Sequence, residues 1–135
     1  MPTMVFINLP VKDVDAATNF YLGLGYTKNE MFSDDSTSSI VISDTIVLML
    51  LHDAKFQSFV TKPLGDSEQE TFGTICLSVE NRDDVDRLND LAIASGGTAN
   101  KEPIDMGFMY NRSFHDLDGH LIELVWMDPT ANPGE

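Results

Sequence analysis

The residues best suited to acid–base chemistry lie near the end of the sequence, around Glu123. This carboxylate belongs to the run LIELV, and on a strand it shares one face with two aliphatic residues. A charge on an apolar face is costly unless it is paired. If Asp116–Gly119 is the loop of a hairpin, Arg112 lies opposite Glu123 on the neighbouring strand. We therefore expect a cross-strand Arg112–Glu123 ion pair, with an acid–base role or a metal-ligand role for Glu123 as the alternatives.

Other polar residues indicate hydrogen bonding to a ligand rather than covalent chemistry. Tyr110 follows the flexible Gly107, and its hydroxyl either orients a bound molecule or belongs to a half-buried aromatic. Four polar residues, namely Asn8, Thr74, Cys76 and Ser78, are expected to point away from the predicted helices, where they contact a ligand or only pack locally. Cys76 has no sequence neighbour that would lower its pKa, which argues against a nucleophile.

Two histidines flank the predicted hairpin turn. His115 precedes and His120 follows the segment DLDG, so the two imidazoles approach each other across the hairpin. Together with Asp116 they form an alternative metal site. The other interpretation is that both are solvent-facing turn residues.

The periodicity of the chain predicts the elements that position these residues. Short β-rich runs between turn residues predict strands, and helical spacing after a capping residue predicts helices. The predicted strands are 5–11, 26–32, 39–42, 46–51, 74–79, 111–115 and 120–126, with an extended segment at 98–102. The predicted helices begin after Asp13 and after Asn81 or Asp83, and end at Gly25 and Gly96, with a short helix at 53–60.

The same order of elements occurs twice along the chain. A first module at 1–60 is followed by a linker at 61–71, a second module at 72–128 and a tail at 129–135. The sequence therefore predicts a single α+β domain of two βαβββ modules. Their mixed β-sheet would form an open, barrel-like cup, which is a natural site for a small molecule.

Composition limits the partners of the protein. The 135 residues carry 8 basic and 22 acidic side chains, and the formal net charge of −14 disfavours nucleic acids and anionic membrane surfaces. The longest apolar run, 46–51, is far too short to span a bilayer. The single cysteine excludes an internal disulfide and fits a reducing compartment. Because the first residues also lack the pattern of a secretion signal, we expect a cytoplasmic protein.

Three segments resemble the vicinal-oxygen-chelate superfamily, which includes glyoxalase I, bleomycin-resistance proteins and extradiol dioxygenases. They are INLPVKDVDAATNFYLGLGY, ICLSVENRDDVDRLNDLAIASGG and FMYNRSFHDLDGHLIELVWMDP. Within the superfamily, the chain is most similar to small lactoylglutathione-lyase-like proteins. The resemblance implies a paired βαβββ fold, a homodimer and, in the enzymes, one divalent metal inside the cup. The ligands of that metal are a histidine or similar donor on the first strand, and a glutamate on the last strand, of each module.

The resemblance implies that the four ligand positions are occupied by Phe6, Met49, Thr74 and Glu123, with Leu50 as an alternative to Met49. Only Glu123 keeps a ligand type. One carboxylate cannot supply the three or four ligands of a catalytic metal, so we expect the inherited metal site to be absent. The metal-dependent activities of the superfamily are then in doubt together.

The leading hypothesis is a metal-independent homodimer that binds a small molecule, which is cationic or neutral because the protein is acidic. The alternative is a lyase or isomerase in which Glu123 is the general base and Arg112 or Tyr110 stabilises an enolate-like oxygen. A protein-interaction module is the third interpretation. No cofactor is expected, with a divalent metal as the alternative. The residues predicted to line the cup are Phe6, Asn8, Met49, Thr74, Cys76, Tyr110, Arg112 and Glu123.

Overall fold

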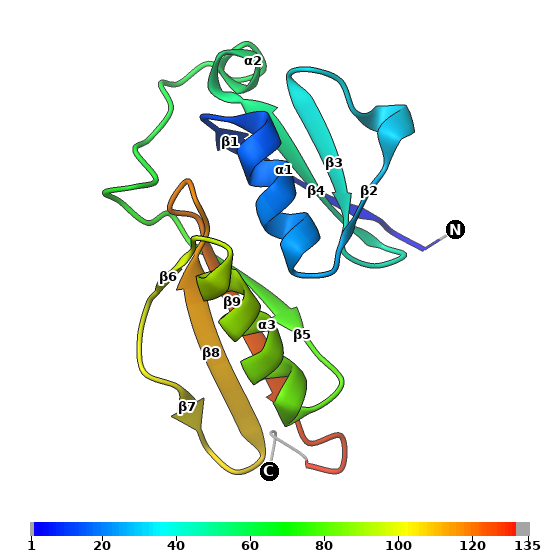
Figure 1. Ribbon diagram of the computed structural model, residues 1–135, viewed down its shortest axis with the longest axis vertical. Coiled ribbons are helices and arrows are strands. Elements are labelled where there is room, and N and C mark those ends of the chain that lie inside the picture. The colour runs from blue at the N-terminus through cyan, green and yellow to red at the C-terminus, as the bar shows by residue number, and fades with distance from the viewer. Residues whose placement is uncertain (1, 132–135) are drawn as a thin grey trace. The chain divides into compact units, whose positions relative to one another are not determined.

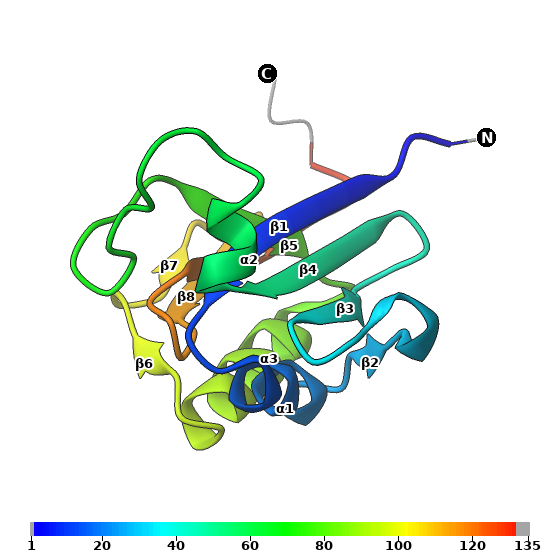
Figure 2. The ribbon, with the colours of Figure 1, turned by 90° about the horizontal axis from the view of Figure 1, so that it is seen from above.

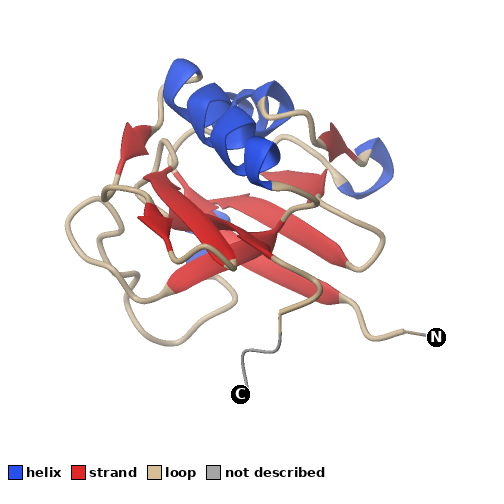
Figure 3. Cartoon of the chain, turned by 90° about the horizontal axis from the view of Figure 1, so that it is seen from below, coloured by secondary structure: helices blue, strands red, loops and turns tan. Residues whose placement is uncertain are grey.

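The computed structural model describes residues 2–131, so residues 132–135 of the predicted tail lie outside the described residues. The chain divides into two compact units, Met1–Asp66 (unit 1) and Ser67–Glu135 (unit 2). The boundary falls within the segment 61–71. Each unit has its own sheet and its own long helix, which confirms the α+β class and the repeated order of elements. In each unit the long helix forms a layer along one face of the strands (Figure 3).

Unit 1 is built around a parallel pair of strands. Its elements are β1 (Val5–Val11), α1 (Val14–Gly23), β2 (Thr27–Lys28), η1 (Glu30–Phe32), β3 (Thr37–Val41), β4 (Ile46–His52) and α2 (Asp53–Gln57). β1 runs parallel to β4, while β3 pairs antiparallel with both β4 and β2 (Figure 2). α1 packs on β3 and β4. Its N-cap is Asp13, whose carboxylate accepts a hydrogen bond from the amide of Ala16 at 3.0 Å.

Three elements of unit 1 differ most from the sequence prediction. The predicted strand 26–32 is reduced to β2, because the side chain of Asn29 accepts a hydrogen bond from the amide of Met31 at 3.1 Å and starts the 3-10 turn η1. The strand predicted at 39–42 begins two residues earlier, at Thr37. The helix predicted at 53–60 ends at Gln57.

Unit 2 places its last strand inside the sheet. Its elements are β5 (Thr74–Ser78), α3 (Arg82–Ala94), β6 (Thr98–Ala99), β7 (Ile104–Asp105), β8 (Met109–His115) and β9 (Leu121–Met127). β9 lies between β5, to which it is parallel, and β8, with which it forms an antiparallel hairpin. α3 covers β8 and β9 (Figure 1). It is capped by Asn81, whose side chain accepts a hydrogen bond from the amide of Asp84 at 2.9 Å.

Each unit buries aliphatic and aromatic side chains between its helix and its sheet. Ile40, Leu48 and Leu50 are fully buried in the sheet of unit 1. In unit 2, Phe114 and Leu124 are fully buried on the strands that α3 covers. In the described part of the chain, none of the helices has the length and apolar character that a bilayer crossing requires.

Candidate functional site

Three polar side chains form a row across the sheet of unit 2. The strand register pairs Glu123 of β9 with Cys76 of β5 on one side and with Ser113 of β8 on the other. Register partners in neighbouring strands point to the same face of the sheet, so the carboxylate stands between a thiol and a hydroxyl. Glu123 is half-buried and Ser113 is buried, whereas Cys76 is exposed on the edge strand.

The row belongs to the sheet face opposite α3, which we call the polar face. Among the alternate residues of the same strands, Leu77, Phe114 and Leu124 point toward α3 and are buried. Glu123 is thus surrounded mainly by polar neighbours, which its own strand sequence LIELV does not reveal. The polar residues of this face are Thr74, Cys76, Ser78, Asn111, Ser113, His115 and Glu123, and the apolar residues Met109, Leu121, Val125 and Met127 share it.

Both flanking side chains of the row are held in place by hydrogen bonds. Cys76 is exposed as a residue, but partial desolvation of its thiol raises the pKa of that group, and the charge and hydrogen bond of Glu123 raise this pKa further. The thiol is therefore protonated at neutral pH and donates to the carboxylate, which makes Cys76 a poor nucleophile. The hydroxyl of Ser113 accepts a hydrogen bond from Nδ2 of Asn100 at 3.0 Å.

The predicted Arg112–Glu123 ion pair is wrong, because the β8–β9 hairpin is shifted by one residue from the predicted register. Ser113, and not Arg112, lies opposite Glu123. The prediction counted Asp116 as part of the loop, but its amide donates to the carbonyl of His120 at 2.9 Å and extends the hairpin. A shift of one residue turns each side chain toward the other face of the sheet.

Tyr110 and Arg112 lie on the helix face of β8, which corrects their predicted place beside Glu123. The Tyr110 hydroxyl donates to Oδ1 of Asp86 at 2.7 Å, and Nη1 of Arg112 donates to Asp86 at 2.9 Å and to Asp90 at 3.2 Å. Both aspartates belong to α3. The hydrogen bonds from Tyr110 and then from Arg112 lower the pKa of Asp86, and the same bond to Asp86 raises the pKa of Tyr110.

A second arginine extends this network toward β7. Cζ of Arg82 lies 4.5 Å from the ring centroid of Tyr110 and 5.6 Å from that of Trp126. The guanidinium also forms an ion pair with Asp105. Because these contacts join α3 to three strands of the sheet, we assign a structural role to Tyr110 and Arg112.

Three predicted site residues share one face of the sheet in unit 1. Asn8 of β1 is the register partner of Met49 in β4, and Phe6, two residues before Asn8, points to the same side. Phe6 is 58% exposed. Leu50 points to the opposite face and is fully buried, so the ligand position carried over to β4 falls on Met49. The eight predicted residues thus separate into this group, the unit 2 group of Thr74, Cys76 and Glu123, and the helix-face pair Tyr110 and Arg112.

The alternative metal site at His115, His120 and Asp116 finds no support in residues 2–131. Oδ1 of Asp116 accepts hydrogen bonds from the amides of Asp118 and His120, both at 2.9 Å. No three His, Cys, Asp or Glu side chains of the described residues gather as metal ligands would. The Asp116 carboxylate instead holds the turn between β8 and β9.

Sequence reasoning missed Asn111 and Ser113 of the polar face, and it considered His115 only as a turn residue or a metal ligand. The signal that would have found them lies in the turn. Gly119 has a φ of 87°, the left-handed conformation that closes a three-residue hairpin loop. A loop of Leu117–Gly119 gives the observed register and turns these three side chains toward Glu123.

Comparison with protein families gives one match over most of the chain. A family model described as the Glyoxalase/Bleomycin resistance protein/Dioxygenase superfamily matches residues 3–124. No protein with a curated description matches the sequence significantly.

Similar solved structures cover nearly the whole chain. A hypothetical protein from S. aureus has a TM-score of 0.78 and 26% identity, over 93% of this chain and 95% of its own. A glyoxalase/bleomycin resistance protein/dioxygenase family enzyme from Burkholderia phytofirmans has a TM-score of 0.76 and 16% identity, over 93% and 99%. A genomically encoded fosfomycin resistance protein from Listeria monocytogenes has a TM-score of 0.67 and 22% identity, over 93% of each chain. The last two similarities concern the fold alone.

The helix-face network predicts a pH-dependent effect of Asp86→Asn. The pKa of Asp86 is lowered in the folded protein, so the ionised carboxylate stabilises the fold above its unfolded pKa of about 3.9. This contribution is lost as the pH falls through the folded pKa. Because the side chain is 49% exposed, solvent screening limits the loss at pH 7 to about 1 kcal/mol or less. Urea unfolding should show a gap between wild type and variant that closes toward pH 3.

Asp44→Asn is the matched control for that experiment. Asp44 is exposed in the turn between β3 and β4, so its neutralisation changes the net charge equally without touching the network. A stability gap for Asp86→Asn that is absent at pH 7, or that persists unchanged in acid, would contradict the structural role of the network.

Proposed function

This chain belongs to the glyoxalase/bleomycin resistance protein/dioxygenase superfamily, and from that premise we propose that it binds a small organic molecule on the polar face of unit 2. The observation that carries the proposal is the row of Cys76, Glu123 and Ser113. A half-buried carboxylate among uncharged polar groups is an arrangement suited to orienting a ligand. The packing of unit 2 does not require a carboxylate at position 123, since the core of the unit lies on the other face of the sheet.

The charge of the site favours a cationic or neutral ligand. The polar face as defined above contains no lysine or arginine, so Glu123 offers its negative charge to a bound molecule. The net charge of −14 acts in the same direction by attracting cations toward the protein. A hydrogen bond from a ligand cation to Glu123 would be charge-assisted and therefore stronger than a neutral one. Thr74 and Ser78 supply further hydroxyls on the exposed edge strand.

The metal site of the superfamily does not fit the residues of this chain. The positions carried over from the resemblance hold a phenyl ring at Phe6, a thioether at Met49, a hydroxyl at Thr74 and a carboxylate at Glu123. Divalent metals of catalytic sites need three or more nitrogen, oxygen or thiolate ligands. We therefore propose a binding function that requires no resident metal, and we derive no chemical step through one.

A lyase or isomerase reaction is the second candidate, with Glu123 as its general base. The carboxylate of Glu123 is available as a base, but its predicted partners Tyr110 and Arg112 are hydrogen-bonded to α3 on the other face of the sheet. Cys76 and Ser113 are the groups that stand beside Glu123 instead. A protonated thiol and a serine hydroxyl stabilise a developing negative charge less well than a cationic guanidinium, so we rank binding above catalysis.

We also propose that the protein is a cytoplasmic homodimer. The resemblance implies a dimer, and large apolar side chains such as Phe59 and Phe72 are 70% and 78% exposed in the single chain. Burial of such side chains in an interface would be favourable. The exposed thiol of Cys76 suits a reducing compartment.

The binding proposal predicts that ligand charge and Glu123 both matter. Cationic and neutral aromatic drugs of similar size should raise the melting temperature saturably, and anionic ones should not. Glu123→Gln keeps the shape of the side chain and removes its charge, and should weaken binding of a cationic drug roughly 10-fold or more. Isothermal titration calorimetry measures this change. Glu80→Gln, at an exposed site outside the polar face, is the control. Equal binding of anionic drugs, or an unchanged affinity in Glu123→Gln, would refute the site.

Metal addition tests whether the site works without a metal. Chelator-treated protein should unfold at the same temperature with and without Ni²⁺, Co²⁺, Mn²⁺, Fe²⁺ or Zn²⁺. A metal that binds only the folded state, at 100 times its dissociation constant, would add about 2.7 kcal/mol of stability. A shift of that size that disappears in Glu123→Gln would restore metal-dependent chemistry as the leading function.

The oligomeric state has a direct measurement. Light scattering coupled to size exclusion should give twice the mass of the chain across a range of protein concentrations. A monomer mass at every concentration would exclude the homodimer, and would leave the binding proposal to be judged by calorimetry alone.

A further inference from the structure

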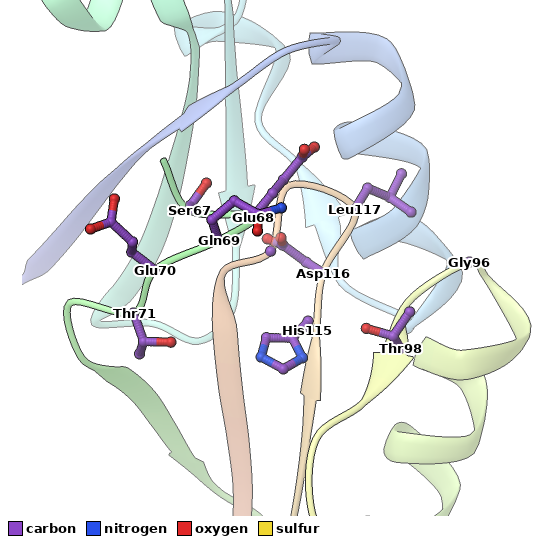
Figure 4. A pocket seen from close by; sticks show the side chains of 11 residues that line it. Ser67, Glu68, Gln69, Glu70, Thr71, Gly96, Thr98, His115, Asp116 and Leu117 are labelled. Atoms are coloured by element: carbon purple, nitrogen blue, oxygen red, sulfur yellow. The ribbon is translucent and has the colours of Figure 1, made fainter. Parts of the chain in front are cut away.

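A pocket of about 360 Å³ lies in unit 2, apart from the Cys76–Glu123–Ser113 row (Figure 4). Its walls come from the segment 67–71, from the start of β6 and from the turn between β8 and β9. The volume falls within the range of about 300–1,000 Å³ typical of small-molecule sites. The lining residues that carry the argument are Ser67, Glu68, Glu70, Thr71, Thr98 and His115.

Specific contacts fix Ser67, the first residue of the segment 67–71, against the hairpin turn. The hydroxyl of Ser67 donates to the carbonyl of Asp118 at 2.6 Å. Gly119 lets the two backbones approach, because a Cβ at that position would overlap the carbonyl group of Ser67. Since residue 119 also needs a positive φ, both the turn and the pocket wall depend on glycine. The start of the pocket wall, at Ser67, is therefore fixed to the turn.

The lining combines hydroxyls, an imidazole and carboxylates. Thr98 is the register partner of His115, and Figure 4 shows the imidazole between the side chains of Thr71 and Thr98. Glu70 lies toward the outside of the pocket, and Glu68 belongs to the same segment. None of the described residues that line the pocket is a lysine or an arginine, so the pocket carries negative charge.

We propose that this pocket binds a small hydroxyl-bearing amine, with the ammonium group beside Glu70 and the hydroxyls bonded to Thr71, Thr98 and His115. Two hydroxyl side chains and an imidazole offer both donors and acceptors to a polyhydroxylated ligand. The acidic wall then selects its cationic form over a neutral or anionic analogue. The inference goes beyond the proposed function: the pocket shares His115 with the polar face, but none of Cys76, Ser113 and Glu123, the row on which that function rests, lines it.

Glucosamine, glucose and glucuronate test the proposal, because they share one ring and differ in charge. Two-dimensional ¹H–¹⁵N NMR detects binding even at millimolar dissociation constants. Glucosamine should shift the amide signals of Thr71, Thr98 and His115 saturably, glucose should bind more weakly, and glucuronate should not bind. Equal binding of glucose and glucosamine, or saturable shifts confined to residues outside the pocket, would overturn the proposal, as would the absence of any shift.

Variants separate this pocket from the Cys76–Glu123–Ser113 row. Glu70→Gln should weaken glucosamine binding roughly two- to fivefold, as expected for one exposed charge, whereas Glu80→Gln and Glu123→Gln should leave it unchanged. A loss with Glu80→Gln equal to that with Glu70→Gln would mean non-specific attraction and would refute the site. A loss with Glu123→Gln would place the ligand on the polar face instead.

The pocket wall provides a second and independent test. Ser67→Ala removes the hydrogen bond to the turn and should weaken glucosamine binding without unfolding the protein. Gly119→Ala should abolish glucosamine binding, because the added Cβ would overlap the carbonyl group of Ser67. Gly25→Ala controls for backbone strain, because Gly25 also has a positive φ but no atom close to its Cβ position. Unchanged affinity in folded Ser67→Ala would overturn the proposal, because the pocket wall would then not contribute to binding.

Discussion

The register of β8 against β9 decides which side chains meet Glu123, and a short turn sets that register. Asp116 accepts hydrogen bonds from two amides of the turn, and Gly119 adopts a φ of 87° that favours glycine. With this turn Ser113 lies opposite Glu123; with a loop one residue longer, Arg112 would. A single backbone position therefore determines whether the acid meets a hydroxyl or a guanidinium.

The turn also separates the charges of unit 2 between two faces of one sheet. On the helix face, Arg112 and Arg82 are paired with aspartates, and these pairs fasten α3 and β7 to the strands. On the polar face, Glu123 has a thiol and a hydroxyl as register partners and no cation among the residues that define that face. The network that stabilises the unit thus leaves one acidic group for recognition, which is the basis of the preference for a cationic or neutral ligand.

Much of the fold was predictable because its signals are local. The cap at Asn81, the alternation in 74–79 and the helical spacing after Asp13 each depend on a few neighbouring residues, and each marks an element of the structure. The strand predicted at 26–32 failed because one side-chain hydrogen bond, from the amide of Met31 to Asn29, outweighed β propensity. Placing Arg112 failed for a different reason: a pairing partner depends on the loop length, and alternation along one strand carries no information about its neighbour.

The two units repeat a backbone pattern without repeating its chemistry. Phe6 pairs with Val47 and Thr74 pairs with Leu121, so Met49 and Glu123, each two residues further along, occupy equivalent positions in their sheets. One position holds a thioether and the other a carboxylate. Because the register is the same in both sheets, the difference lies in the side chains alone and not in how the strands pair. The repeat therefore accounts for the fold of both units, while the acid–base and charge recognition that the site can offer is concentrated in unit 2.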